Sequence, residues 1–170
     1  MRWAEVLSTM LFIRRRLLLT LLDTFGQRLN NTDFQKLLFL YTMDCEEKPS
    51  YDFVPYRFGA FSFTSYADKR RLIEAGMLVD DDNHWSLTEV GHEAVRKKPV
   101  AQKTIDQFYS RHVGLRGNEL IAEVYRRYPY YATRSEIIDR VLPDPTDRAR
   151  VAVARPQRLV SGLLTIGYEG

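Results

Sequence analysis

Residues 11–25 constrain the fold most strongly, because apolar side chains cover most of the circumference of the helix they predict. The large apolar residues of this segment are Phe12, Ile13, Leu17, Leu18, Leu21, Leu22 and Phe25. Only a helix that neighbouring elements cover on several sides tolerates such a pattern. We therefore expect a compact helical body built around this segment, with Gly26 ending the helix.

A second helix is predicted immediately after it. The run Asn30-Asn31-Thr32 offers N-cap side chains, and residues 33–43 follow with helical periodicity. Within that run, apolar residues recur at i, i+3, i+4 and i+7, namely at Phe34, Leu37, Leu38 and Tyr41. This spacing predicts one buried stripe along the helix.

The next segments predict a strand, a third helix and a β-hairpin. Residues 51–58 alternate and are rich in aromatics, although Pro55 would confine such a strand to a sheet edge. Ser62 is expected to cap a helix that ends at Gly76. Residues 77–79 and 84–87 then flank a four-residue loop, a hairpin pattern, and Thr88 begins a helix through Lys97.

Three helices followed by a hairpin are the order of a winged helix. We therefore predict a mainly α (α+β) protein, with a winged-helix-like domain over residues 1–98. Helices at 103–112, 118–128 and 135–142 predict a helical extension over residues 99–142, packed on that domain. Residues 143–158, rich in Pro and Arg, are expected to be a linker, and residues 159–170 a terminal strand.

Three stretches, QKLLFLY, YDFVPYRFGAFSF and RLIEAGML, combine a Lys-Leu-Leu helix, an aromatic strand, a glycine turn and a helix ending in glycine. This part of the chain resembles the Panacea (SocA-like) domain. Ala60 stands where that family usually has proline. The matching positions are Lys36, Leu37, Leu38, Tyr56, Gly59, Leu72, Gly76 and Leu78. The resemblance implies an antitoxin-like protein that acts by binding a protein partner.

The last residues, TIGYEG, are similar to the opening strand of the domain-of-unknown-function family 488. The stretch YRRYPYYATRSEI is similar to a helix found in N-terminal extensions of that family. The resemblance implies that residues 159–170 are the first strand of a truncated C-terminal domain. Such a strand carries unpaired backbone groups, so we expect it either to fray or to join another sheet edge and mediate a homodimer.

The sequence contains no pattern typical of a catalytic or metal-binding site. His84, His92 and His112 show no metal-ligand spacing, and the acidic residues beside Cys45 disfavour its thiolate. The trio Asp80-Asp81-Asp82 lacks the alternating ligands of a calcium loop and reads as a solvated hairpin tip. We therefore predict no enzyme activity, no cofactor and no metal.

Composition bears on the compartment. The single cysteine, Cys45, excludes an intramolecular disulfide and favours a reducing, cytoplasmic setting. The stretch RRRLLLTLLD has an apolar run too short for a signal peptide or a membrane span, so no membrane partner is expected.

DNA binding is one functional alternative. The helix before the hairpin of a winged helix enters the major groove, and here it carries Lys69, Arg70 and Arg71. Further cations follow at Arg96 and Lys97. However, Asp68 is spaced to pair with Arg71, Glu74 is spaced to pair with Arg70, and the aspartates of the hairpin would repel phosphates.

Recognition of a protein partner is the preferred alternative. The stretch VYRRYPYYATRS contains Tyr125, Arg126, Tyr130 and Tyr131, and tyrosine and arginine are enriched at interface hot spots. The same tyrosines also suit the interface between the two halves of the chain. Lys36 lies on an apolar helix, where it either anchors a partner or extends its amine to solvent. We predict a non-enzymatic regulatory or adaptor module, antitoxin-like, with DNA binding as the alternative.

Overall fold

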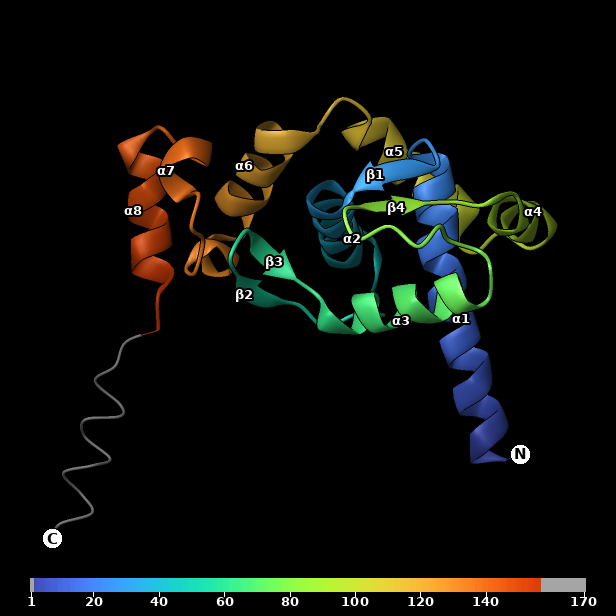
Figure 1. The fold of residues 1–170 in the computed structure, drawn as a ribbon. Coiled ribbons are helices and arrows are strands. Elements are labelled where there is room, and N and C mark those ends of the chain that lie inside the picture. The colour runs from blue at the N-terminus through green and yellow to red at the C-terminus, as the bar shows by residue number, and fades with distance from the viewer. Residues whose placement is uncertain (1, 157–170) are drawn as a thin grey trace, which may run out of the picture.

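The computed structural model describes residues 2–156 and shows a mainly helical protein with two small antiparallel sheets (Figure 1). The helices are α1 (Trp3–Thr24), α2 (Asn31–Cys45), α3 (Phe63–Glu74), α4 (Glu89–Lys97), α5 (Gln102–His112), α6 (Gly117–Arg127), α7 (Ile138–Val141) and α8 (Pro145–Ala154), with the 3-10 turn η1 (Pro129–Ala132). The strands are β1 (Arg28–Asn30), β2 (Val54–Tyr56), β3 (Gly59–Phe61) and β4 (His84–Ser86). The strand predicted over residues 159–170 lies outside the described residues.

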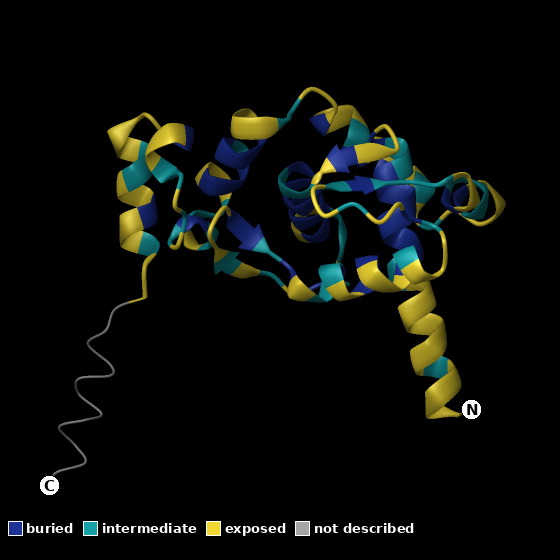
Figure 2. Cartoon of the chain, in the orientation of Figure 1, coloured by how far each residue is buried: buried dark blue, intermediate teal, exposed yellow. Residues whose placement is uncertain are grey.

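The core is centred on α2 and the C-terminal half of α1. Helix α2 is buried along most of its length, and α1, α5 and α6 pack around it. Residues 17–22 of α1 are buried, as the sequence pattern predicts. Residues 11–13 are exposed, however, because α1 begins at Trp3 and its N-terminal half extends beyond the body (Figure 2).

One of the two sheets is formed by a strand pairing that the sequence pattern did not predict. Strand β4 pairs antiparallel with β1, with Leu29 opposite Trp85. The predicted hairpin is present in a weaker form, in which Leu78 pairs with Leu87 across an isolated bridge. Trp85 is fully buried and stacks on Phe34 of α2, with ring centroids 4.0 Å apart.

The second sheet is the β2–β3 hairpin. The chain predicted as one strand over residues 51–58 forms strand only at Val54–Tyr56, turns at Arg57–Phe58 and returns as β3 from Gly59. Pro55 lies in this two-stranded sheet, where every strand is an edge. The Ser62 side chain accepts a hydrogen bond from the Ser65 backbone N–H, so the predicted cap of α3 is confirmed. The Thr88 cap of α4 is confirmed in the same way.

The C-terminal part of the described chain differs from the predicted extension and linker. Of the helix predicted at 135–142, only Ile138–Val141 is helical. Residues 143–158, predicted as a linker, instead contain helix α8, which packs on η1 and α6 and buries Val151. The reason is local, since Asp144 caps α8 and Pro145 occupies its first turn, where proline is favoured. Among residues 2–156, no helix combines the length and apolarity that a bilayer span needs.

Candidate functional site

Lys36 is buried, contrary to the expectation that its amine reaches solvent. Only 2% of its surface is exposed, and its Nζ donates a hydrogen bond to the Ala60 backbone O at 2.9 Å. Burial lowers the pKa of Lys36 to about 7, and the nearby Asp33 carboxylate opposes that shift. The amine therefore lies in the interior and titrates near neutral pH.

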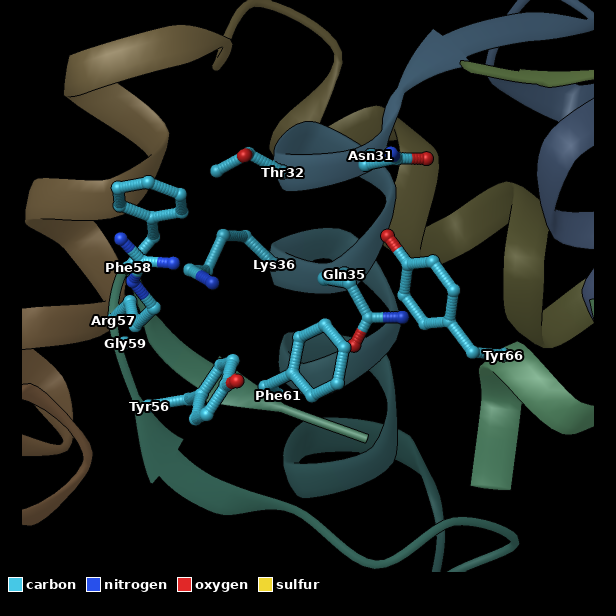
Figure 3. A pocket seen from close by; sticks show the side chains of 10 residues that line it. All are labelled: Asn31, Thr32, Gln35, Lys36, Tyr56, Arg57, Phe58, Gly59, Phe61 and Tyr66. Atoms are coloured by element: carbon cyan, nitrogen blue, oxygen red, sulfur yellow. The ribbon is translucent and has the colours of Figure 1, made fainter. Parts of the chain in front are cut away.

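A cavity of about 260 Å³ adjoins Lys36 (Figure 3). Helix α2 forms one side, and the β2–β3 hairpin and α3 contribute aromatic side chains to the others. Tyr56 and Tyr66 both contact the Phe61 ring, with centroid distances of 5.1 and 5.0 Å. The lining residues are Asn31, Thr32, Gln35, Lys36, Tyr56, Arg57, Phe58, Gly59, Phe61 and Tyr66.

Gly59 allows the hairpin to approach Lys36 closely. Its φ is +96°, and a Cβ built there would lie 2.5 Å from Tyr125 Cε1 and 3.3 Å from Lys36 Cε. Tyr125 is fully buried and donates a hydrogen bond to Ser135 Oγ at 2.7 Å, and burial raises its pKa to about 12. Tyr125 therefore packs against the hairpin at Gly59 from the interior of the protein. It is not available for the partner contact that the sequence suggested.

The other residues of the predicted partner cluster are divided between interior and surface. Tyr131 is half-buried, with its ring 4.7 Å from that of Phe39. Tyr130 is 46% exposed, and Arg126 is paired with Asp147 of α8 at 3.1 Å. The tyrosines mainly fill the interface between α2, α6 and η1, which leaves Tyr130 as the exposed tyrosine of the predicted set.

Helix α3 does not present the row of three cations that the DNA alternative uses. Lys69 is 5% exposed, donates a hydrogen bond to the Asp81 backbone O at 2.8 Å and lies 5.3 Å from the Trp85 ring centroid. Burial lowers its pKa, and the aspartates of the loop oppose the shift. Arg70 is exposed and lies 3.7 Å from Asp80. The loop aspartates therefore compensate the basic helix within the same chain.

The remaining predicted cations also have acidic neighbours or lie elsewhere. Arg71 pairs with Glu74 at 3.2 Å, and Arg96 pairs with Glu93 of its own helix. Lys97 is exposed on α4. Within the described residues, neither the i, i+3 pair between Asp68 and Arg71 nor the i, i+4 pair between Arg70 and Glu74 forms.

Asp68 instead joins α3 to α1. Its buried carboxylate accepts hydrogen bonds from Arg14 at 2.7 Å, from Arg15 at 3.2 Å and from the Tyr51 hydroxyl at 2.8 Å. These donors hold the pKa of Asp68 below its ordinary value although burial acts in the opposite direction. The network fixes α1 at the point where the helix leaves the body.

Beyond that point, α1 exposes an apolar surface that sequence reasoning missed. Trp3 is 83% exposed, Leu7 56% and Met10 61%, and these residues follow one another at i, i+4 and i+7. A groove of about 370 Å³ continues the surface between Leu7, Met10, Ile13 and residues 48–50. We call residues 3–13 of α1 the projecting segment. The sequence signal was the all-round apolar pattern, which was interpreted as cover by neighbouring elements.

Within the described residues, no group of three or more His, Cys, Asp or Glu side chains is placed to hold a metal. His92 lies 2.8 Å from Asp23, and His84 lies 3.3 Å from Asp81. His112 is buried, stacked on Phe108. Each histidine thus has a local structural contact.

Comparison with known proteins adds no relative. No family model, no curated protein and no solved structure matches the chain.

Proposed function

We propose that this protein is a non-enzymatic regulatory or adaptor module that recognises a protein partner through the projecting segment of α1. The observation that carries the proposal is the exposure of Trp3, Leu7 and Met10 on one face of a helix. Large exposed apolar surfaces on monomeric proteins mark interaction sites. The antitoxin-like role implied by the Panacea resemblance is of the same kind, since an antitoxin of that type acts by binding.

The occupant we propose is a folded partner with an apolar groove. Anchors at i, i+4 and i+7 are typical of a helix that lies in a groove. The exposed apolar residues also include Leu11, Phe12 and Ile13, which extend around the helix. A groove on the partner would cover more of the circumference of α1 than a single helix packed beside it would.

A second copy of the chain is the weaker occupant. The projecting segment has 11 residues between Trp3 and Ile13 and spans about 16 Å at 1.5 Å per residue. Two such segments side by side bury one stripe each, which falls short of the roughly 800 Å² per partner of a standard stable interface. The hydrogen bonds of Asp68 to Arg14 and Tyr51 hold α1 in place before a partner binds. This reduces the entropy that binding of a folded partner to the projecting segment would cost.

We also propose that residues 1–98 form a winged-helix-like domain. The order α1, β1, α2, α3 and β4, with β1 paired to β4 and Leu78 opposite Leu87, is consistent with it. The β2–β3 hairpin would then be an insertion between its second and third helices. DNA binding stays the alternative prediction, and the contacts of Lys69 and Arg70 with the loop aspartates disfavour it.

Site-specific photo-crosslinking tests the partner proposal. A photoreactive residue at Met10 is expected to capture one protein in the cells that encode this chain. The affinity of that purified protein for the wild type is then compared with two variants. Leu7→Asp is expected to weaken binding at least about tenfold, because it places a charge in the groove. Thr9→Asp, which places a charge on the side of the same helix that faces away from Leu7, is the matched control.

Three results would contradict the proposal. Crosslinking only to a second copy of this chain would make the projecting segment a dimer interface. Equal weakening by Leu7→Asp and Thr9→Asp would mean that the apolar face does not carry the binding. A mobility shift on DNA that is lost steeply with added salt, together with no captured protein, would favour the DNA alternative.

A further inference from the structure

The cavity beside Lys36 is separate from the surface proposed for the partner. The β2–β3 hairpin, which forms part of its wall, lies at the opposite side of the body from the projecting segment (Figure 1). None of the residues that line the cavity belongs to α1. The proposed partner recognition therefore does not account for it.

The cavity has the electrostatic character of an anion site. Lys36 Nζ makes one hydrogen bond within residues 2–156, to the Ala60 O, and a protonated amine has two further N–H donors. Thr32 lies one helical turn before Lys36 and also lines the cavity. Thr32 is in the first turn of α2, where the helix dipole favours negative charge, and Lys36 follows in the second turn.

The acidic groups nearest to the cavity already have partners. Asp33 is buried, and its carboxylate accepts hydrogen bonds from the Gly117 N–H at 2.8 Å and the Asn30 side chain at 3.1 Å. Glu136 pairs with Arg57 at the rim at 2.9 Å. Gln35 is occupied as well, since it bonds Ser65 and Ser62. Among the polar groups left for a ligand, Lys36 supplies the buried cation. Asn31, which also lines the cavity, has a buried Oδ1 acceptor without a hydrogen-bond partner within residues 2–156.

The lining residues and the volume of the cavity restrict the size, shape and charge of the anion that it can hold. Four aromatic side chains line the cavity: Tyr56, Phe58, Phe61 and Tyr66 (Figure 3). Its volume of about 260 Å³ is below the roughly 300–1,000 Å³ of pockets for drug-sized ligands. A single buried cation suits one negative charge, whereas a phosphate dianion would bring a charge that nothing buried here compensates. The ligand is therefore small, flat and monoanionic.

We propose that this cavity binds a small aromatic monocarboxylate, with the carboxylate accepting hydrogen bonds from the Lys36 ammonium and the ring lying among the aromatic side chains. The ligand supplies a carboxylate in direct hydrogen-bond contact with Lys36, whose own hydrogen bond within residues 2–156 goes to the neutral Ala60 O. Lys36 takes up a proton on binding when the free protein holds it as an amine. Binding therefore weakens as the pH rises above about 7, the pKa of Lys36 in the free protein.

Titration calorimetry with phenylacetate and its neutral isostere phenylacetamide tests the proposal. Phenylacetate is expected to bind the wild type at least about tenfold more tightly than phenylacetamide, and to take up a proton at pH 8 or so. Lys36→Met is expected to weaken phenylacetate binding at least about tenfold and to abolish the proton uptake. Lys103→Met, at an exposed lysine of α5, is the matched control and is expected to change neither.

The variant also separates Lys36 from the other ionisable groups that face the cavity. Tyr56 and Arg57 on the hairpin and Tyr66 on α3 line it. Asp33 on the same helix and Tyr125 on α6 lie behind the lining, near Lys36 and Gly59. A pH dependence that survives in Lys36→Met belongs to one of them and overturns the proposal. Equal binding of phenylacetate and phenylacetamide, or no binding of phenylacetate at millimolar concentration, overturns it too.

A second measurement on the wild type covers the case in which Lys36→Met does not fold. Acetic anhydride labels lysine amines, and mass spectrometry follows the rate at each position. Phenylacetate is expected to slow labelling of Lys36 at least about tenfold, to leave Lys103 unchanged, and to be more effective than phenylacetamide. Labelling of Lys36 at the same rate with and without phenylacetate would contradict the proposal.

Discussion

Lys36 makes stability depend on pH at the scale of a single residue. Its pKa is about 7 in the folded chain and ordinarily 10.5, so between these values the unfolded chain binds a proton that the folded chain does not. The free energy of unfolding therefore rises with pH over this window, by at most about 1.4 kcal/mol per pH unit. Below pH 7 or so, Lys36 is protonated in both the folded and the unfolded chain, so the folded state bears the full free-energy cost of burying the charge.

Lys36→Met is expected to remove this dependence and to be more stable than the wild type at neutral pH and below. Urea unfolding of both proteins at several pH values between these two pKa values measures the effect. Lys103→Met, at an exposed position, is expected to keep the wild-type slope. Identical slopes in Lys36→Met and the wild type would show that another group titrates.

Gly59 is the residue whose replacement is expected to damage the cavity most directly. Gly59→Ala combines a positive φ with a Cβ only 2.5 Å from Tyr125 Cε1. We expect a loss of about 2–4 kcal/mol in the free energy of unfolding. Gly26→Ala has a similar φ of +109° with nothing within 4 Å, so it reports the backbone strain alone, about 1 kcal/mol. Equal losses in the two variants would mean that the close contact at Gly59 relaxes.

At the scale of the element, α1 is one helix with two different environments. Leu18→Ala, in the buried half, is expected to lower the free energy of unfolding by about 2–5 kcal/mol, because it leaves a cavity in the core. Leu7→Ala, in the projecting segment, is expected to change it by less than about 0.5 kcal/mol. Chemical denaturation measures both. A large loss for Leu7→Ala would show that the projecting segment is covered by another part of the molecule.

The elements differ in how well local sequence predicted them. The caps at Ser62 and Thr88 were predicted correctly because a cap depends on residues within three positions of it. Strand β1 was missed, since Arg28–Asn30 is too short to show alternation and its partner β4 lies more than 50 residues away. Helix α8 was missed because proline and arginine were interpreted as linker composition, although Asp144-Pro145 is a helix start.

At the scale of the whole molecule, residues 2–156 are expected to unfold as one unit. Ile105 and Phe108 of α5 and Leu120 and Val124 of α6 are fully buried in the same core cluster as α1 and α2. Calorimetric and van't Hoff enthalpies of unfolding are therefore expected to agree. Fluorescence of buried Trp85, measured in a Trp3→Phe background, is expected to follow the same transition as far-ultraviolet circular dichroism. Two separate transitions would divide the chain into a winged-helix-like domain and an independent extension.

The sequence alone determined where most helices lie, which stripe of α2 is buried and where α3 and α4 begin, because periodicity and capping act over a few neighbouring residues. Only the tertiary structure decided what the polar side chains do. Asp68 was expected to pair three residues along its own helix, yet it binds Arg14, which is 54 positions away. Lys36 became the buried amine of a cavity because a hairpin folds over it at Gly59. Charge and burial depend on distances in space, and spacing along the chain leaves those distances open.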